Sequence, residues 1–256
     1  MVSMNIDFHT HVKLAKRVNF DPDFFHEVIL NAKEAGLQAL AMTEHFNTSR
    51  FYDIYEELDK RYEYKGNYYL VDGFKVFTGM EIDVKETGHI LFIGHKKEIL
   101  QTRDLLEAHT SEADFIALEE LLEIGERFNF LKIGAHPLRS TTPLTQHSTD
   151  LLKRLDAFDL NGKDLYEHGV KEMERDVLAF AELVNLPVVC GSDSHHPIHL
   201  GAVWNQFSND CETAIDLKAE ITSSNYTRTI SPVLRTKIGA AKIVKKQIKQ
   251  ELVAGM

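Results

Sequence analysis

Short apolar runs alternate with longer amphipathic segments along this chain of 256 residues, and the alternation limits the folds it can adopt. Each run is too short for a helix, and most are bordered by Gly, Pro, Asn or Asp, as strands usually are. The runs cover residues 5–8, 39–42, 75–78, 89–93, 132–134, 157–160 and 187–190. Helical patterns cover residues 22–35, 117–128 and 170–184. Strands joined by helix-length segments predict parallel β-α-β units.

The same pattern predicts one α/β domain that spans residues 1–256. Seven strands in a chain of this length favour closure into a barrel, and no linker, low-complexity tract or internal repeat divides the sequence. Hydrophobic residues make up 43% of the chain, with only 14 Gly and 6 Pro. This composition argues against a disordered or fibrous protein.

The formal net charge of -10 argues against a protein that coats DNA or RNA, because such proteins present a basic surface. Nucleic acid is therefore a disfavoured partner, although an enzyme that holds one phosphate stays compatible with this charge. Cys190 and Cys211 are too few for a disulfide framework, and neither a membrane span nor a signal peptide is evident. We expect a cytoplasmic protein with no membrane partner; the oligomeric state is left open.

The end of the chain has the opposite charge to the rest. Residues 226–256 contain seven Lys or Arg and one acidic residue. A helix is predicted at about 236–253, with one apolar face made by Ile238, Ala241, Val244, Ile248 and Leu252. We favour a helix packed on an acidic body with its lysines in solvent, and a phosphate- or nucleic-acid-facing role is the alternative.

Histidines and acids cluster next to the predicted strands. His9 and His11 lie two residues apart at the end of the first strand, so their imidazoles emerge on the same face. Parallel α/β barrels build their active sites at the carboxyl ends of strands. Further His, Asp and Glu side chains follow other strands at Glu44, His45, Glu81, His136, Asp193 and His195. His89 differs, because it opens its strand.

These side chains predict metal-assisted hydrolysis. Imidazole and carboxylate ligands without thiolates suit Zn, Mn or Fe(II). A carboxylate can bridge two such ions, which together clamp a phosphate and convert a bound water into hydroxide.

The order of the motifs resembles the PHP (polymerase and histidinol phosphatase) superfamily. The resemblance covers about residues 4–207 and rests on His9-x-His11, Thr43-Glu-His45, Gly79-Met-Glu81, His89-Ile-Leu, Gly134-Ala-His136-Pro and Gly191-Ser-Asp193-Ser-His195. It implies a distorted (β/α)7 barrel with two or three metal ions at the carboxyl ends of the strands. Carried over by motif, it assigns His9, His11, Glu81 and Asp193 to one ion. Glu81 would bridge to a second ion held by His89 and His136, with His45 and His195 on the side of a third.

The segment after His11 departs from the family pattern. Many members place an extra His or Asp there to complete the third site, whereas this chain has Lys16 and Arg17. A charged Lys or Arg has no lone pair for a metal. We therefore predict two firmly bound divalent ions of Zn, Mn or Fe and a weak or absent third, with Asp21 or Glu44 as the alternative third-site ligand.

Three cations are candidate substrate contacts. Arg139 follows His136 by three residues, and its guanidinium suits a pair of phosphate oxygens. Arg139 is therefore predicted to hold the substrate in catalysis, and Lys16 and Arg17 are further candidates. His195 is a candidate for proton transfer, in competition with its role as a ligand.

The sequence thus predicts a metal-dependent phosphoesterase that attacks a small phosphorylated substrate with a metal-bound hydroxide. The alternatives are a histidinol-phosphate phosphatase, a nucleotide phosphatase or nuclease, and an accessory module of the same fold without catalysis.

Overall fold

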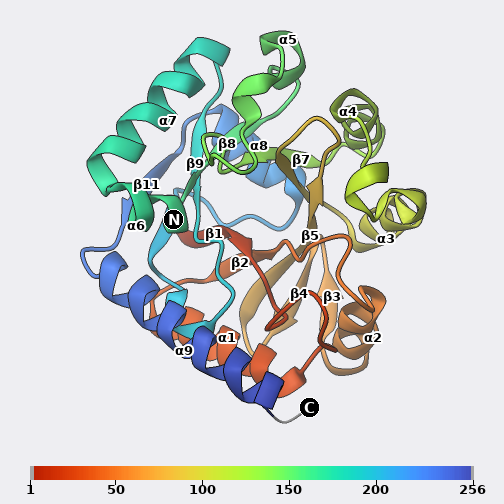
Figure 1. Cartoon of the computed structure of the whole chain (residues 1–256), viewed down its shortest axis with the longest axis vertical. Coiled ribbons are helices and arrows are strands. Elements are labelled where there is room, and N and C mark those ends of the chain that lie inside the picture. The colour runs from red at the N-terminus through yellow and green to blue at the C-terminus, as the bar shows by residue number, and fades with distance from the viewer. Residues whose placement is uncertain (1–2, 255–256) are drawn as a thin grey trace.

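Seven strands curve into a nearly closed barrel in a computed structural model that describes residues 3–254 (Figure 1). In order around the sheet they are β1 (Met4–Thr10), β2 (Ala39–Met42), β5 (Phe74–Asp83), β6 (His89–Ile93), β7 (Leu131–Ala135), β8 (Ala157–Asn161) and β9 (Val188–Gly191). All seven apolar runs are strands. The predicted α/β barrel is confirmed.

The predicted parallel order is wrong for β6. Strands β1, β2 and β5 pair in parallel, as do β7, β8 and β9, but β6 is antiparallel to both of its neighbours. Only residues 84–88 join β5 to β6, and such a short connection cannot make the crossover that parallel pairing needs. Because β6 runs in reverse, its first residue, His89, lies at the same end of the barrel as the carboxyl ends of the other strands.

The barrel closes between β9 and β1 through a few hydrogen bonds. The backbone N–H of His11 donates to the carbonyl of Ser194 at 2.9 Å, and the N–H of Asp193 donates to the carbonyl of His9 at 2.8 Å. The Asn205 side chain bridges the two strands nearer their starts, because its amide donates to the carbonyls of Ile6 and Cys190. Closure therefore joins the two segments that carry His9, His11 and Asp193.

The remaining strands extend the barrel rather than form it. Strand β10 (Val203–Phe207) pairs antiparallel with β1 and carries β11 (Tyr226–Ile230) at the sheet edge. Strands β3 (Glu63–Lys65) and β4 (Tyr68–Val71) form a hairpin on the first half of β5.

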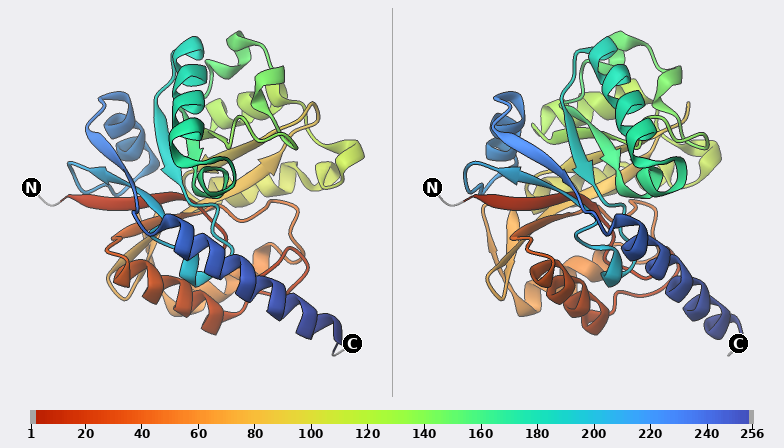
Figure 2. Two further views of the ribbon diagram at one scale, coloured as in Figure 1. Left: turned by 60° about the vertical axis from the view of Figure 1, so that its left-hand side comes forward. Right: turned by 90° about the vertical axis from the view of Figure 1, so that its left-hand side faces the viewer.

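Helices surround the sheet on its outer side, apart from one that covers the end of the barrel where the strands begin (Figures 1 and 2). The predicted helices are α1 (Pro22–Glu34), α4 (Leu118–Arg127) and α7 (Val170–Val184). Others are α2 (Tyr52–Arg61), α3 (Lys96–Leu105), α5 (Thr149–Leu152), α6 (Gly162–His168) and α8 (Ala214–Thr222), with short 3-10 turns η1 (Glu107–His109), η2 (Glu112–Asp114), η3 (Leu144–Gln146) and η4 (Pro197–His199).

The barrel interior is apolar where the strands begin. Ile6, Ala39, Leu91 and Ile133 form one cluster there, and Leu217 of α8 packs into it. A second cluster lies between the sheet and the outer helices. Apolar packing thus fills one end of the barrel and leaves the other end to polar side chains.

The basic C-terminal segment forms helix α9 (Leu234–Ala254), close to the predicted range. Ile238 and Ala241 are buried as predicted, Val244 and Ile248 are half-buried, and the Leu252 side chain lies outside the described residues. Figure 2 shows α9 crossing the molecule beside α1. Within residues 3–254, none of the helices combines the length and apolarity that a membrane crossing requires.

Gly191 at the end of β9 lets β8, β9 and β1 approach closely. A Cβ at this position would collide with the Cβ of His9 and lie 2.8 Å from Asp159 Oδ1. We expect Gly191→Ala to lower the free energy of unfolding by about 1–3 kcal/mol, as overpacking of a filled interior does. Chemical denaturation measures this loss.

Gly239 provides the matched control. A Cβ there meets only Tyr166 at 3.5 Å or more, and the position is inside α9. Gly239→Ala should leave stability unchanged or raise it by up to about 1 kcal/mol, because Ala favours helix over Gly. Equal effects of the two substitutions would contradict the proposed close approach at Gly191.

Candidate metal centre

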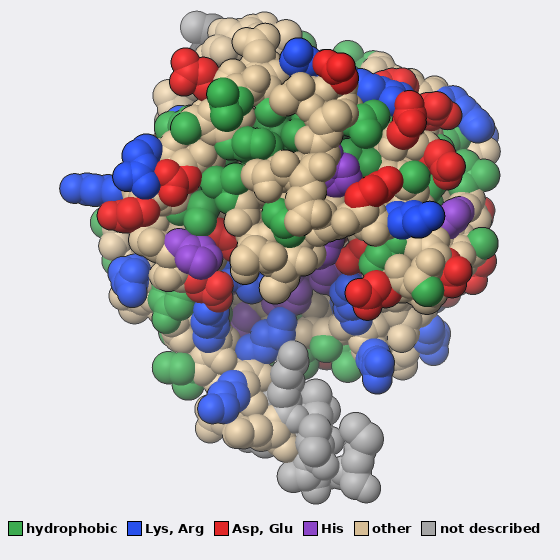
Figure 3. Space-filling model, turned by 45° about the horizontal axis from the view of Figure 1, so that its top comes forward, with side chains coloured by type: hydrophobic (Ala, Val, Ile, Leu, Met, Phe, Trp, Pro, Cys, Tyr) green, Lys and Arg blue, Asp and Glu red, His purple; other side chains and the backbone are tan. Residues whose placement is uncertain are grey.

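All eight side chains predicted as metal ligands come together at the carboxyl end of the barrel. Their donor atoms form three groups, each with its atoms within 4.8 Å of one another. The groups are His9, His11 and Asp193; Glu81, His89 and His136; and His11, His45 and His195. Figure 3 shows histidine side chains in a hollow that has both basic and acidic side chains around it. The second group has the same residues as the second ion site that the resemblance implies, and the first group has those of the first site without Glu81. That these groups bind ions stays a prediction.

We call these eight side chains the cage. Glu81 lies at its centre and is only 2% exposed. Its Oε1 is 2.7 Å from His89 Nδ1, 3.3 Å from His136 Nε2 and 3.5 Å from His9 Nε2. Its Oε2 is 2.8 Å from His45 Nδ1 and 3.5 Å from the Nε2 of His11. Glu81 thus reaches imidazoles of all three groups.

The electrostatics of Glu81 reflect its neighbours. Burial alone would raise the pKa of this carboxyl, but the surrounding imidazoles, His45, His89 and His9 foremost, hold it well below its usual value. For His89, burial lowers the pKa, while the charge of Glu81 and the hydrogen bond to Asp83 outweigh burial and raise it to about 9. Burial lowers the pKa of His136 to about 3, so this imidazole is neutral and keeps a lone pair at pH 7.

A bulge in β1 turns His9 toward the cage. Ile6 pairs with Ala39 and Thr10 pairs with Met42, so β1 has one residue more than β2 over this stretch. Because side chains alternate between faces, one extra residue moves those that follow to the opposite face. His9 therefore faces the barrel interior with Ile6, although the two residues are three positions apart in the strand.

Two ligand positions have unusual backbone. His136 has φ of 32° and Asp193 has φ of 56°, in the left-handed region that residues other than glycine rarely adopt. Such conformations cost on the order of 1–3 kcal/mol each and cluster at functional sites. His136 directly follows β7, and Asp193 is the second residue after β9. The turn at each position directs the side chain toward the cage.

Several buried polar atoms in the cage make no hydrogen bond of regular geometry among residues 3–254, although His45 Nδ1 and Glu81 Oε2 lie 2.8 Å apart. They are His9 Nε2, His11 Nε2, His45 Nδ1 and Glu81 Oε2. An unsatisfied buried polar atom costs about 1–3 kcal/mol. These atoms belong to imidazoles and a carboxylate and converge, so the donor set fits divalent cations of the borderline class.

Acidic side chains behind the ligands select their ring tautomers. Asp159 Oδ2 lies 3.1 Å from His9 Nδ1, and Glu44 Oε1 lies 3.4 Å from His11 Nδ1. A carboxylate can only accept, so in the neutral form of each ring the proton lies on Nδ1, and Nε2 has the lone pair that a metal would need. Asp159 was missed in the sequence, although its position near the end of β8 could have suggested it.

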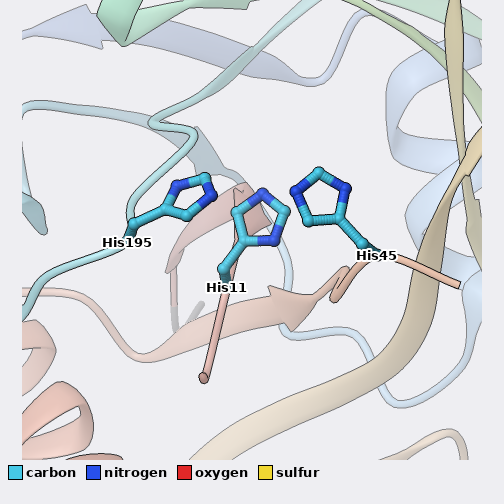
Figure 4. Close-up of side chains that lie close together, drawn as sticks. All are labelled: His11, His45 and His195. Atoms are coloured by element: carbon cyan, nitrogen blue, oxygen red, sulfur yellow. The ribbon is translucent and has the colours of Figure 1, made fainter. Parts of the chain in front are cut away.

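The third group consists only of imidazoles. Figure 4 shows the rings of His11, His45 and His195 facing one another, and the centroid of His11 is 4.4 Å from that of His45 and 3.9 Å from that of His195. The group has no carboxylate of its own. Glu81 and Asp193 lie next to this group but belong to the other two groups, so a cation here would share their negative charge with the other ions and be held less firmly.

Neither alternative ligand for the third site joins the cage. Asp21 caps the N-terminus of α1, where its side chain accepts from the N–H groups of Asp23 and Phe24. Glu44 hydrogen-bonds to His11 and accepts from the backbone N–H groups of Val12 and Lys13. Placing these acids as third-site ligands is therefore wrong: local capping requirements fix the orientation of both.

Arg139 lies at the cage, but acidic side chains already hold it. Its Nη2 donates to Asp193 Oδ2 at 2.9 Å and to Asn161 Oδ1 at 3.0 Å, and its Nε donates to Asp164 at 2.8 Å. These bonds orient the carboxylate of Asp193. Contact of Arg139 with a substrate phosphate stays a prediction.

The other predicted cations differ in position. Lys16 Nζ is 3.9 Å from Asp83, the partner of His89, so Lys16 lies at the edge of the cage. Arg17 is exposed and contacts none of the predicted ligands in the described part of the chain. Lys163, not considered in the sequence, follows β8 and lies 3.1 Å from Asp193 Oδ2.

Sequence profiles identify the family. The PHP domain matches residues 22–112, and the PHP-associated region matches residues 174–225. This chain is a PHP domain protein. The two matched segments include His45, Glu81, His89, Asp193 and His195; the other three ligand candidates are brought to them by the fold. A comparison with curated proteins gave no match.

Solved structures share the fold at low sequence identity. PsfC from Pseudomonas syringae PB-5123 is 21% identical with a TM-score of 0.80, and the match covers 97% of this chain and 100% of PsfC. The lesion-specific endonuclease EndoQ from Pyrococcus furiosus is 19% identical with a TM-score of 0.66, over 90% of this chain and 58% of EndoQ. Endonuclease Q has also been solved with a 27-mer duplex substrate that contains an abasic lesion. At these identities the likeness concerns the fold.

The three ligand groups predict unequal metal occupancy. We expect two firmly bound ions per chain and a third that dialysis against a weak chelator removes first, because the all-histidine group lacks an acid. Elemental analysis of gently purified protein checks this prediction. Three near-stoichiometric ions that leave together would contradict it.

Asp159 should affect metal binding without contacting the ion. We expect Asp159→Asn to weaken metal binding by about 10-fold or more, because the charge that orients His9 is lost. Competition with a chromophoric chelator measures the affinity. Asp150→Asn, at a side chain 93% exposed, is the matched control and should leave the affinity unchanged. Equal affinities for both variants would show that Asp159 does not orient the ligand.

Proposed function

We propose that this chain is a metal-dependent phosphoesterase that hydrolyses a small phosphorylated substrate. The observation that carries the proposal is the buried Glu81 carboxylate within reach of five imidazoles. Three of these rings, those of His9, His11 and His45, each have a buried nitrogen without a hydrogen-bond partner in the described part of the chain. Such a donor set has the composition of sites that bind two adjacent divalent ions, and membership in the PHP family is consistent with it.

The proposal assigns the candidate ligands to two metal ions. His9, His11 and Asp193 would hold one ion, His89 and His136 a second, and Glu81 would bridge them. When bound, divalent ions would neutralise charge on the phosphate oxygens and make water more acidic. The donor types favour Zn, Mn or Fe.

Two cations and one histidine at the edge of the cage would bind the substrate and transfer a proton. Arg139 is oriented by Asp164 and Asp193, so its guanidinium is held rigidly beside the cage and would orient the phosphate. Lys16 would contribute charge at the opposite edge, near Asp83. His195 is half-buried at the cage and would move a proton during the reaction when it does not ligate an ion.

Two alternatives receive less support. Acidic and basic side chains are interspersed on the face around the hollow in Figure 3, which does not favour a long nucleic-acid strand. An accessory module without catalysis would be expected to have lost ligands, yet all eight come together. A histidinol-phosphate phosphatase stays within the proposed class, and no described feature singles out that substrate.

Two free, buried cysteines fit the proposed cytoplasmic location.

The proposal predicts metal-dependent hydrolysis of a generic substrate. Protein reconstituted with Mn, Zn or Fe should hydrolyse phenyl phosphate, and Asp193→Ala should reduce the rate to background because one ligand group loses its acid. Phosphate release measures the rate, and circular dichroism verifies the fold. Asp176→Ala, at an exposed position on α7, is the control and should keep full activity.

The outcomes separate the alternatives. A folded wild-type protein that binds metal but hydrolyses no phosphate ester would favour the accessory module. Cleavage of oligonucleotides but not of small esters would favour the nuclease.

A further inference from the structure

A small pocket separates the metal centre from helix α9. Its volume is about 50 Å³, room for on the order of four water molecules or one carboxylate or phosphate group. The residues that line it include Lys163, Asp193, His195, His199, Ile238 and Lys245. The pocket shares Asp193 and His195 with the ligand groups, so a group bound in it adjoins the metal centre.

Positive charge predominates in this pocket. Lys163 and Lys245 both line it, and the one acid that lines it, Asp193, accepts hydrogen bonds from both Lys163 and Arg139 and belongs to a metal group. Lys242 also borders the pocket, but its Nζ pairs with Glu167 at 2.6 Å. A pocket with this balance of charges favours an anion.

His199 adds a directed hydrogen-bonding group. Its side chain is 4% exposed, and its Nε2 has no hydrogen-bond partner in the described part of the chain. With the proton on Nε2, this ring would donate to an oxygen placed in the pocket. A bound oxyanion would therefore satisfy a buried polar atom that is otherwise unpaired.

We propose that this pocket is a subsite for a second anionic group, a carboxylate or phosphate, on the substrate whose scissile phosphate lies at the metal centre. The inference rests on the proposed phosphoesterase function and narrows its substrate class to small phosphate esters with a second negative charge. Lys163 and Lys245 neutralise this charge, and His199 donates a hydrogen bond. In this proposal the basic helix α9 lines the active site, and at least one of its lysines binds the substrate instead of lying in solvent.

Two non-hydrolysable ligands test the subsite by binding alone. Methylphosphonate and 3-phosphonopropionate share a phosphonate, but only the second has a carboxylate. Isothermal titration of the full chain loaded with Mn should show about tenfold tighter binding of 3-phosphonopropionate, the gain expected from a charge-assisted hydrogen bond. Lys245→Gln should reduce this preference toward one, and Lys245→Glu should reverse it.

Lys246→Gln is the matched control. Lys246 is the next residue on α9, is exposed and does not line the pocket, so its loss removes the same charge and should keep the tenfold preference. Equal binding of the two ligands by the native chain, no binding of either, or a preference that survives Lys245→Gln overturns the subsite.

Phenyl phosphate hydrolysis, measured on the same native sample, separates this inference from the function. Hydrolysis without any preference between the phosphonates rejects the subsite alone. Preference without hydrolysis under any metal rejects the phosphoesterase, and with it the assignment of the second group to a substrate.

Discussion

A carboxylate buried among imidazoles is the constraint around which this molecule is organised. Glu81 is almost wholly enclosed, and a charge in such a place is tolerated only with compensating partners. Its neighbours come from β1, from the segment after β2, from β6 and from the turn after β7. The barrel therefore brings four separate parts of the chain to one point, and the polar end of the barrel encloses the Glu81 carboxylate.

The architecture explains why the cage and its supports differ in character. Apolar packing of the strands with α8 fills the end of the barrel where the strands begin, so that end contributes stability. At the other end, acids such as Asp159 and Glu44 lie against the rings of His9 and His11, two of the candidate metal ligands, and orient them. Helix α9 then adds lysines near the cage from the far end of the sequence. Three separate parts of the molecule thus serve stability, ligand orientation and the proposed substrate recognition: the apolar end of the barrel, the acids behind the cage and helix α9.

The sequence predicted the seven barrel strands because each apolar run is short and has turn residues at its ends, which local patterns reveal. It missed β10 and β11, whose polar residues Asn205, Gln206 and Arg228 interrupt the apolar pattern. It also missed the roles of Asp159 and Lys163, since an acid inside a strand and a lysine shortly after it belong to no distinctive motif. Arg139 was singled out for phosphate, and only the contacts show that acidic side chains already orient it.

The sequence by itself determined the kind of chemistry, because the donor atoms of His, Asp and Glu are properties of the residues and their order along the strands is readable. Tertiary structure decided which atoms meet. The reversal of β6 brings His89 to the cage, and the extra residue in β1 turns His9 inward. Strand direction and register depend on pairing between distant segments, and such pairing leaves no local trace in the chain.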